Sequence, residues 1–158
     1  ASDKISHLIG RIEGAAEEYY ADFTKNDAKL KFDHIKSISK LSMRLLKSVD
    51  YESVKQIRRQ NFEMYHKRFG KINELNLEIG SSVPLCYPLL VKNGNSLKQK
   101  LIENKIYIPT FWPKVKNDVD ADSFEMRLYI DLLPLPLDQR YSEAEINYVI
   151  NKIEEIGY

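Results

Sequence analysis

The stretch LLPLPLDQRYSEAEINYVINKIEEIGY, residues 132–158, combines an apolar run interrupted by prolines with a strongly periodic segment. The LPLPL run, punctuated by Pro134 and Pro136, predicts a short strand. Ser142 and Glu145 have the S-x-x-E spacing of a capping box, which predicts that a helix begins after Ser142. Its apolar stripe is formed by Ile146, Val149, Ile150, Ile153 and Ile156.

The preceding part of the chain alternates segments rich in β-forming residues with short helices. VPLCYPLLV (83–91) and KIYIPTFWP (105–113) predict proline-bounded strands, and INELNLEI (72–79) alternates loosely. Between them, Asn95 is expected to cap a short helix, and residues 123–132 form another helix after a polar loop. We expect an α+β fold in which a small sheet of three to four strands has helices packed on one face.

The first 69 residues are predicted to be helical, apart from a polar connection. Asp50 is a good N-cap for the long helix that follows it, and Gly70 is expected to end that helix in the left-handed conformation. The sequence therefore predicts two parts: a helical segment over 1–69 and an α+β domain over 70–158. The expected helices cover residues 3–25, 34–47 and 51–69, and the connection covers 26–33.

Charge and cysteine content restrict the classes of partner. The 158 residues include 24 basic and 23 acidic side chains, a net charge of +1, which argues against binding nucleic acid through its phosphates. No apolar run approaches the ~20 residues of a membrane-spanning helix, and the first residues lack a signal-peptide pattern. The single Cys86 cannot form an internal disulfide, which favours a reducing compartment. We expect a cytoplasmic protein that binds neither membranes nor nucleic acid.

Residues typical of catalysis are sparse. His7, His34 and His66 fall on three different predicted helices without metal-ligand spacing, so solvated or half-buried histidines are expected. Cys86 lies in a predicted strand without an adjacent histidine, which disfavours a nucleophile. Glycine-rich phosphate-binding motifs are absent from the sequence.

One predicted helix combines basic and aromatic residues, a pattern that occurs in nucleic-acid-binding proteins. The near-neutral net charge favours a solvated helix face instead. The residues concerned are Lys55, Arg58, Arg59, Lys67 and Arg68, with Phe62 and Tyr65.

The best candidate for a binding site is the aromatic end of YIPTFWPKVK, where Tyr107, Phe111 and Trp112 precede a long polar loop. Strand ends and the loops that leave them are common positions for binding sites. The alternative is that Trp112 fills the core. Because prolines on both sides end the strand and place the indole ring at the strand end, we expect Trp112 to be exposed on a substrate-facing rim.

Four blocks of the sequence, in order, resemble the C-terminal part of DegT/DnrJ-type sugar aminotransferases, which are pyridoxal-phosphate enzymes of the aspartate-aminotransferase fold. They cover much of residues 34–156; the match over 1–33 is weaker. The blocks are VDYESVKQIRRQNFEMYHKRF, VPLCYPLLVKN, LKQKLIENKIYIPTFWP and LLPLPLDQRYSEAEINYVINKI.

The resemblance implies the small domain of an enzyme whose large domain carries the lysine that binds the cofactor covalently. The sequence surrounding that lysine in the family is missing here, so we expect pyridoxal phosphate in the intact enzyme and none on this chain alone. Many members place a histidine a few residues after the Ile-Tyr strand, where this chain has Phe111 or Trp112, which favours stacking over proton transfer. The expected partners are the large domain or a second copy, in a homo-oligomer.

The chain is thus either a fragment or a stand-alone relative. The alternative function is a non-catalytic interaction or dimerisation module. With the large domain removed, the apolar stripes of residues 1–69 would be exposed, and we expect self-association through the first helix.

Overall fold

The computed structural model describes residues 9–10, 14, 18–30, 34–35 and 37–158. The chain divides into two compact units, Ala1–Val49 and Asp50–Tyr158. The sequence predicted that the long helix belongs to the helical segment over 1–69. In the structure this helix belongs to the second unit, because it contacts the sheet and the last helix there.

The first unit contains α2, Tyr20–Leu30, and α3, Lys40–Lys47. The predicted connection over 26–33 is therefore wrong for residues 26–30, which continue α2. These residues are mostly polar, so the sequence shows no apolar stripe that would indicate a helix. Most of the predicted helix over 3–25 lies outside the described residues, as does His7. The helix predicted to begin at His34 begins at Lys40 instead, and the Ser39 hydroxyl accepts a hydrogen bond from the Ser42 amide at 3.0 Å.

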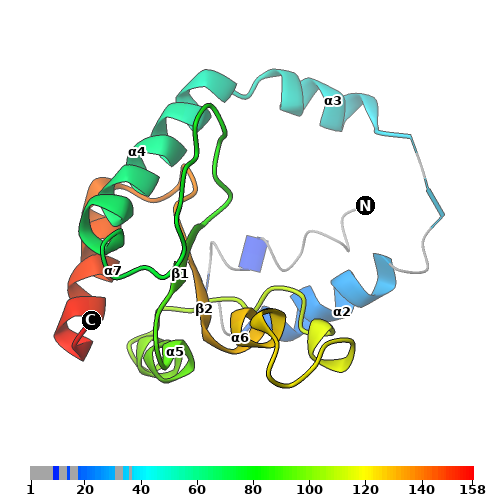
Figure 1. The fold of residues 1–158 in the computed structure, drawn as a ribbon. Helices are drawn as coiled ribbons and strands as arrows, with labels where there is room; N and C mark the ends of the chain where they lie inside the picture. Colours follow the sequence, from blue (N-terminus) through cyan, green and yellow to red (C-terminus); the bar gives the residue numbers. More distant parts are fainter. Residues whose placement is uncertain (1–8, 11–13, 15–17, 31–33, 36) are drawn as a thin grey trace. The chain divides into compact units, whose positions relative to one another are not determined.

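The second unit is α+β, with helices around a small antiparallel sheet (Figure 1). Its elements in chain order are α4 (Tyr51–Phe69), β1 (Tyr87–Leu90), α5 (Gly94–Glu103), the 3-10 helix η2 (Val115–Asn117), α6 (Phe124–Asp131), β2 (Leu132–Leu135) and α7 (Glu143–Ile156).

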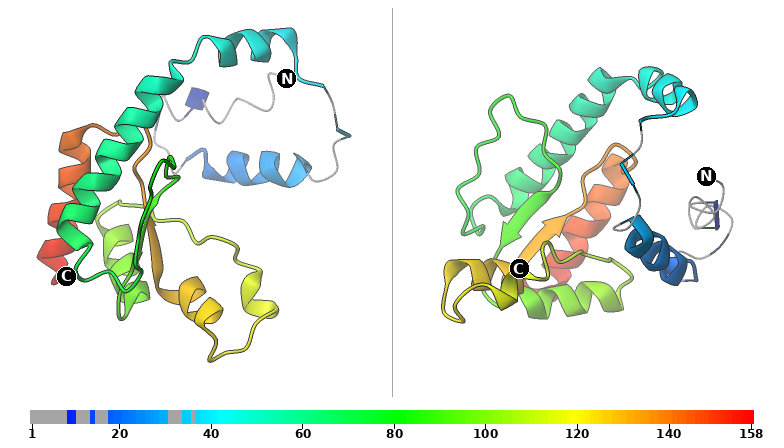
Figure 2. Two further views of the ribbon diagram at one scale, coloured as in Figure 1. Left: turned by 45° about the horizontal axis from the view of Figure 1, so that its top comes forward. Right: turned by 90° about the vertical axis from the view of Figure 1, so that its right-hand side faces the viewer.

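In the described part of the chain the sheet has two strands, β1 and β2, and not the predicted three to four. Pro88 and Pro134 are directly opposite each other. Because neither proline has an N–H, they occupy a pair that exchanges no hydrogen bonds, and the neighbouring pairs Tyr87–Leu135 and Leu89–Leu133 carry the ladder. Figures 1 and 2 show α4 and α7 side by side on the same side of this sheet.

The loosely alternating segment over 72–79 forms no strand, because Asn73 occupies the outer edge of β1 with its side chain. Its amide donates to the Pro88 carbonyl at 2.8 Å, and its Oδ1 accepts from the Leu90 amide at 3.0 Å. The Glu74 amide then donates to the Leu90 carbonyl at 2.9 Å. These three bonds satisfy the edge of β1 without a further ladder.

The segment over 105–113, all of which is described, is not a strand either, although it keeps the alternation of one. Ile106 and Ile108 are buried, whereas Tyr107 between them is exposed. Pro109 and Pro113 remove donors from this segment, and Pro134 and Pro136 remove donors from the region of β2. Alternation in the sequence therefore marks burial here without ladder formation.

The core lies where the sheet meets α4, α5 and α7. Tyr65 and Phe69 of α4, Tyr87 of β1, and Ile146 and Ile153 of α7 are almost completely buried. Burial of each such side chain is worth roughly 1.5–3 kcal/mol. The rings of Tyr65 and Tyr87 are 5.5 Å apart, and this contact joins the helix to the strand.

Two of the expected helix ends are confirmed. The Asp50 carboxylate accepts from the Ser53 amide at 3.0 Å, and Ser142 and Glu145 form a reciprocal capping box at the start of α7. The left-handed end at Gly70 is wrong, since its φ is −56°.

The predicted cap at Asn95 is also wrong. The cap of α5 is the left-handed Asn93, and the Asn95 amide donates to the Asp131 carboxylate at 3.1 Å. A side chain on Gly94 would collide with the Asp131 backbone, because its Cβ would lie 1.9 Å from that carbonyl oxygen. The start of α5 is thus fixed by the end of α6, which local sequence patterns do not reveal.

Among the described residues, no helix is long and apolar enough to cross a membrane.

Candidate functional site

The three aromatic residues proposed from the sequence lie on one short segment between α5 and η2. Tyr107 is 55% exposed, Trp112 is 74% exposed, and Phe111 is partly buried. The exposure expected for Trp112 is therefore confirmed, and the alternative that it fills the core is wrong. Its role toward a substrate stays a prediction.

The conformation of this segment is set by its buried and bonded neighbours. Ile106 and Ile108 pack into the core, and the Lys98 amine of α5 bonds to the Thr110 hydroxyl. Trp112 has a φ of 53°, in the left-handed region that a bulky residue rarely adopts. Its carbonyl accepts from the Val115 amide at 2.9 Å, which closes a turn around Pro113. A strained residue held in this way is typical of functional sites.

The rings of Phe111 and Trp112 form a tilted pair, with centroids 5.8 Å apart and planes at 45°. The exposed indole face can stack on a planar base or on the apolar face of a sugar ring. Partial burial lowers the pKa of the nearby Lys98 amine. We call residues 107–112 the aromatic turn; its chemistry suits binding better than proton transfer.

Arg58 and Arg59 of α4, which belong to the basic and aromatic pattern found in nucleic-acid-binding proteins, contact the protein itself. The Arg59 guanidinium donates to the carbonyls of Ser82 and Gly80 at 2.8 and 2.7 Å. Arg58 donates to the Pro84 carbonyl at 3.0 Å and to the Gln139 side chain at 3.2 Å. Both arginines therefore hold loops of the chain itself.

Asn61 and Tyr65 hold the segment that follows β2. Asn61 is 4% exposed, and its amide nitrogen lies 3.2 Å from the carbonyls of Leu137 and Tyr141. The Tyr65 hydroxyl donates to the Pro136 carbonyl at 3.0 Å, and burial raises the pKa of this phenol. The Arg-Arg-x-Asn stretch that carries the resemblance thus fixes the two loops beside α4. The sequence pointed to Arg58, Arg59 and Tyr65 through the basic and aromatic pattern and to Asn61 through the resemblance, but neither signal gave this role.

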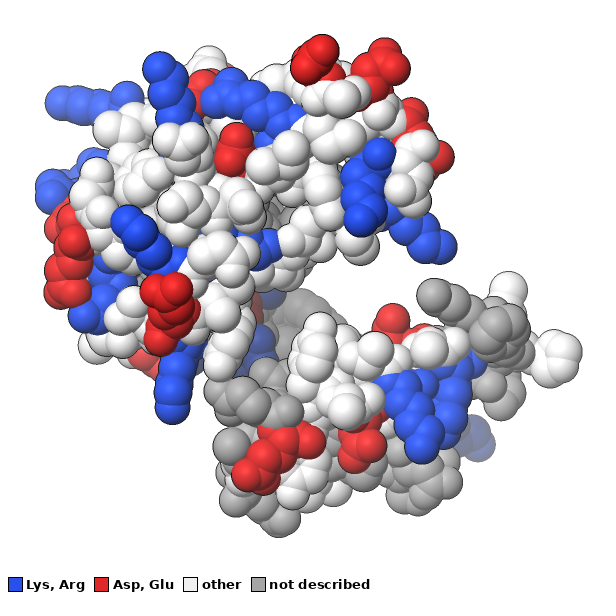
Figure 3. Space-filling view, turned by 90° about the horizontal axis from the view of Figure 1, so that it is seen from below, with Lys and Arg blue, Asp and Glu red and all other residues white. Residues whose placement is uncertain are grey.

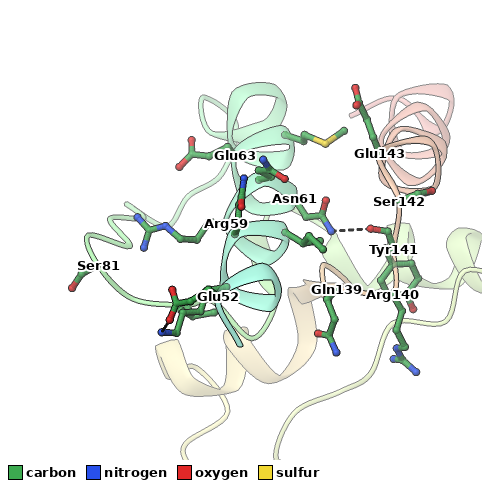
Figure 4. A pocket seen from close by; sticks show the side chains of 16 residues that line it. Glu52, Arg59, Asn61, Glu63, Ser81, Gln139, Arg140, Tyr141, Ser142 and Glu143 are labelled. Carbon is green, nitrogen blue, oxygen red and sulfur yellow. Dashed lines mark hydrogen bonds and ion pairs between the residues drawn. The ribbon is translucent and has the colours of Figure 1, made fainter. Parts of the chain in front are cut away.

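A broad groove of about 1130 Å³ lies along α4 (Figure 4). Arg59 and Ser81 lie on one flank, and Arg140 and Tyr141 on the other. Tyr107, Phe111 and Trp112 do not line it. The groove has both charge signs on its walls, and the Arg140 guanidinium is bonded to Asp138, which lowers the pKa of that carboxyl.

Positive and negative side chains are interspersed over the face drawn in Figure 3. In the part of the chain that the structure describes, no group of three or more histidine, cysteine or acidic side chains could hold a metal ion. Burial raises the pKa of the Cys86 thiol, which disfavours the thiolate a nucleophile needs.

The described residues do not fit pyridoxal phosphate. The cofactor needs a lysine, a carboxylate beside its pyridine nitrogen and donors for its phosphate. Among the described residues, Asn61 is the one buried polar side chain, and loop carbonyls occupy its amide. Lys98 bonds to a hydroxyl and not to a carboxylate.

Comparisons with profiles of known protein families, with characterised proteins and with solved structures gave no match.

Proposed function

We propose that residues 50–158 form the small domain of a pyridoxal-phosphate-dependent sugar aminotransferase of the DegT/DnrJ type. The cofactor-binding lysine and its supporting carboxylate then belong to another part of the enzyme. When bound, pyridoxal phosphate supplies the electron sink for amino transfer. The four sequence blocks motivate this proposal, and the structural observation that supports it best is the exposed Trp112 ring, which pairs with the partly buried Phe111.

In this proposal the aromatic turn is a rim that contacts the sugar substrate. Trp112 presents its exposed indole face, Phe111 forms a tilted pair with that ring, and Tyr107 is an exposed residue of the same turn. The turn binds, orients and excludes water; the chemistry takes place on the large domain. The cytoplasmic location expected from the sequence is part of the same proposal.

Steady-state kinetics of the intact enzyme from its natural gene tests this role. A panel of nucleotide-linked keto sugars and amino donors identifies a substrate pair, and Trp112→Ala is then compared with wild type. Loss of one stacking contact is worth about 1–3 kcal/mol, so the KM for the sugar should rise about fivefold or more, with the amino-donor half-reaction unchanged.

Tyr148→Ala is the matched control, because Tyr148 is also half exposed but lies on α7. If Trp112→Ala and Phe111→Ala behave like this control, the rim is not a substrate contact and the proposal is wrong.

The second candidate function is a non-catalytic interaction module. The observation in its favour is that none of the eight residues of α3 is buried, although four of them are large and apolar: Leu41, Met43, Leu45 and Leu46.

A further inference from the structure

The groove along α4 has one face of this helix as its floor and two loops as its walls. The floor residues lie three and four positions apart: Gln56, Arg59, Gln60, Glu63 and Met64. The walls belong to residues 81–83 and 139–143. Arg59 holds the first wall through the carbonyls of residues 80 and 82, and Asn61 holds the second through the carbonyl of residue 141. Because the protein itself fixes both walls, binding here requires little ordering of the chain.

The groove is larger than the usual site of a small molecule. Its volume of about 1130 Å³ exceeds the roughly 300–1,000 Å³ of such pockets. The α4 residues that line it run from Glu52 to Met64. With a rise of about 1.5 Å per residue, this part of the helix is about 18 Å long. An extended chain rises about 3.3 Å per residue, so about five or six extended residues match the length of the groove.

Two glutamines on the floor match the backbone of such a segment. Gln56 and Gln60 are exposed, and neither bonds to another described residue. A side-chain amide carries the same kinds of donor and acceptor as a peptide group. The two positions are about 6 Å apart along the helix, close to the roughly 6.6 Å between alternate residues of an extended chain. Gln56 and Gln60 are therefore spaced to bond two alternate peptide groups.

The positive side chains that line the groove are already bonded within the protein. The Lys55 amine donates to the Glu52 carboxylate at 2.6 Å, and the Arg140 guanidinium donates to the Asp138 carboxylate at 2.7 Å. The Arg59 guanidinium donates to loop carbonyls. An anionic ligand would have to compete with these bonds.

Two negative side chains of the groove remain available. Glu63 and Glu143 are exposed, and neither forms an ion pair within the described part of the chain. In Figure 4 they lie toward the same end of the groove, on opposite flanks, with Met64 as an apolar neighbour in the lining. A cationic side chain with an aliphatic stem is complementary to this end of the groove.

We propose that the groove along α4 binds an extended segment of another protein that carries lysine or arginine. Gln56 and Gln60 bond its peptide groups, and Glu63 and Glu143 accept its cationic side chain. This inference does not depend on the proposed enzymatic function, since the aromatic turn lies outside the groove.

Nuclear magnetic resonance of the isotope-labelled 158-residue chain tests the proposal. The probe is an end-blocked six-residue peptide of alternating lysine and alanine. We expect saturable binding that shifts the signals of α4 and of both walls, including the side-chain amides of Gln56 and Gln60. The corresponding peptide of glutamate and alanine should not bind. Spermine, which has the positive charge without peptide groups, should bind more weakly and leave the two glutamine side chains unshifted.

Two double variants separate the contributions of backbone and charge. Gln56→Ala with Gln60→Ala should weaken binding about tenfold, because two hydrogen bonds are lost. Glu63→Gln with Glu143→Gln should also weaken it and remove most of its dependence on salt. The matched control is Gln99→Ala with Glu103→Gln, because both residues are exposed on α5 outside the groove. The spectrum of each variant also reports whether it is folded.

Several results would overturn the proposal. These are the absence of saturable binding, shifts confined to other parts of the chain, equal binding of the glutamate peptide or of spermine, and unchanged affinity in both double variants. Self-association that occupies the groove and blocks the probe would assign this surface to a second copy of the chain and would overturn the proposal as well.

Discussion

Asn61→Ala removes the donor that holds the segment between β2 and α7. The Asn61 amide nitrogen lies 3.2 Å from the Leu137 carbonyl, 3.4 Å from the Asp138 carbonyl and 3.2 Å from the Tyr141 carbonyl. With the side chain itself 4% exposed, its removal leaves these acceptors without that donor and opens a small void.

The expected loss of unfolding free energy is about 2–4 kcal/mol. Leaving a buried polar group unsatisfied costs roughly 1–3 kcal/mol, and the void adds to this. The higher helix propensity of alanine returns only a few tenths of a kcal/mol. Against a domain stability of about 5–15 kcal/mol, this is a large fraction of the total.

Urea unfolding followed by far-ultraviolet circular dichroism measures the loss. Lys67→Ala is the matched control, since Lys67 is an exposed residue of the same helix. Asn61→Asp should be at least as damaging as Asn61→Ala, because a carboxylate would face carbonyl oxygens as an acceptor. An Asn61→Ala variant as stable as the Lys67→Ala control would refute the role given to Asn61.

Three further predictions concern single sites. Trp112→Ala should cost no more than about 1 kcal/mol of stability, since the ring is 74% exposed. In the unchanged chain, this single tryptophan should emit at long wavelength and be quenched by iodide. A blue-shifted, unquenched spectrum would contradict the structure. The capping bonds from Ser142 lower the pKa of Glu145, so the Glu145 carboxyl binds a proton less readily in the folded state than in the unfolded state. The resulting stabilisation is present near neutral pH and is lost as pH falls below the usual range of a glutamate. Glu145→Gln should therefore flatten the dependence of stability on pH in acid, and an unchanged dependence would disprove the link between this pKa and stability. Arg59→Ala should speed hydrogen exchange in the 80–83 loop while changing global stability little, since two loop carbonyls lose their donor; unchanged exchange there would show that Arg59 does not hold the loop.

Local patterns in the sequence predicted those features that depend on neighbouring residues. The capping box at Ser142, the Asp50 cap, the apolar stripe of α7 and the strand around Pro134 all depend on spacings within one or two turns. These follow directly from backbone hydrogen-bonding needs at helix ends and from the period of the apolar residues.

The errors arose where distant residues supply the bonds. Asn73 replaces a third strand with one side chain, and Asp131 caps α5 from 36 residues away. The segment over 105–113 alternates like a strand because Ile106 and Ile108 reach the core, but prolines deny it a ladder. The period of the apolar residues reveals neither the distant side-chain bonds nor the missing ladder.

For the candidate site, the sequence predicted the exposure of Trp112 but not its left-handed conformation. The roles of Arg59 and Asn61 also required the structure, because their partners are backbone carbonyls, which any sequence contains. Side-chain type alone could not distinguish a solvent-facing arginine from one that binds a loop.

In the proposed function, this chain serves an active site whose cofactor is held elsewhere in the intact enzyme. Borohydride reduction of that enzyme after incubation with pyridoxal phosphate attaches the cofactor permanently to the lysine that binds it, and peptide mass mapping then locates the lysine. The proposed function predicts one modified lysine per subunit, outside these 158 residues. Stoichiometric modification of a single lysine within them, or no specific modification of the intact protein, would contradict it.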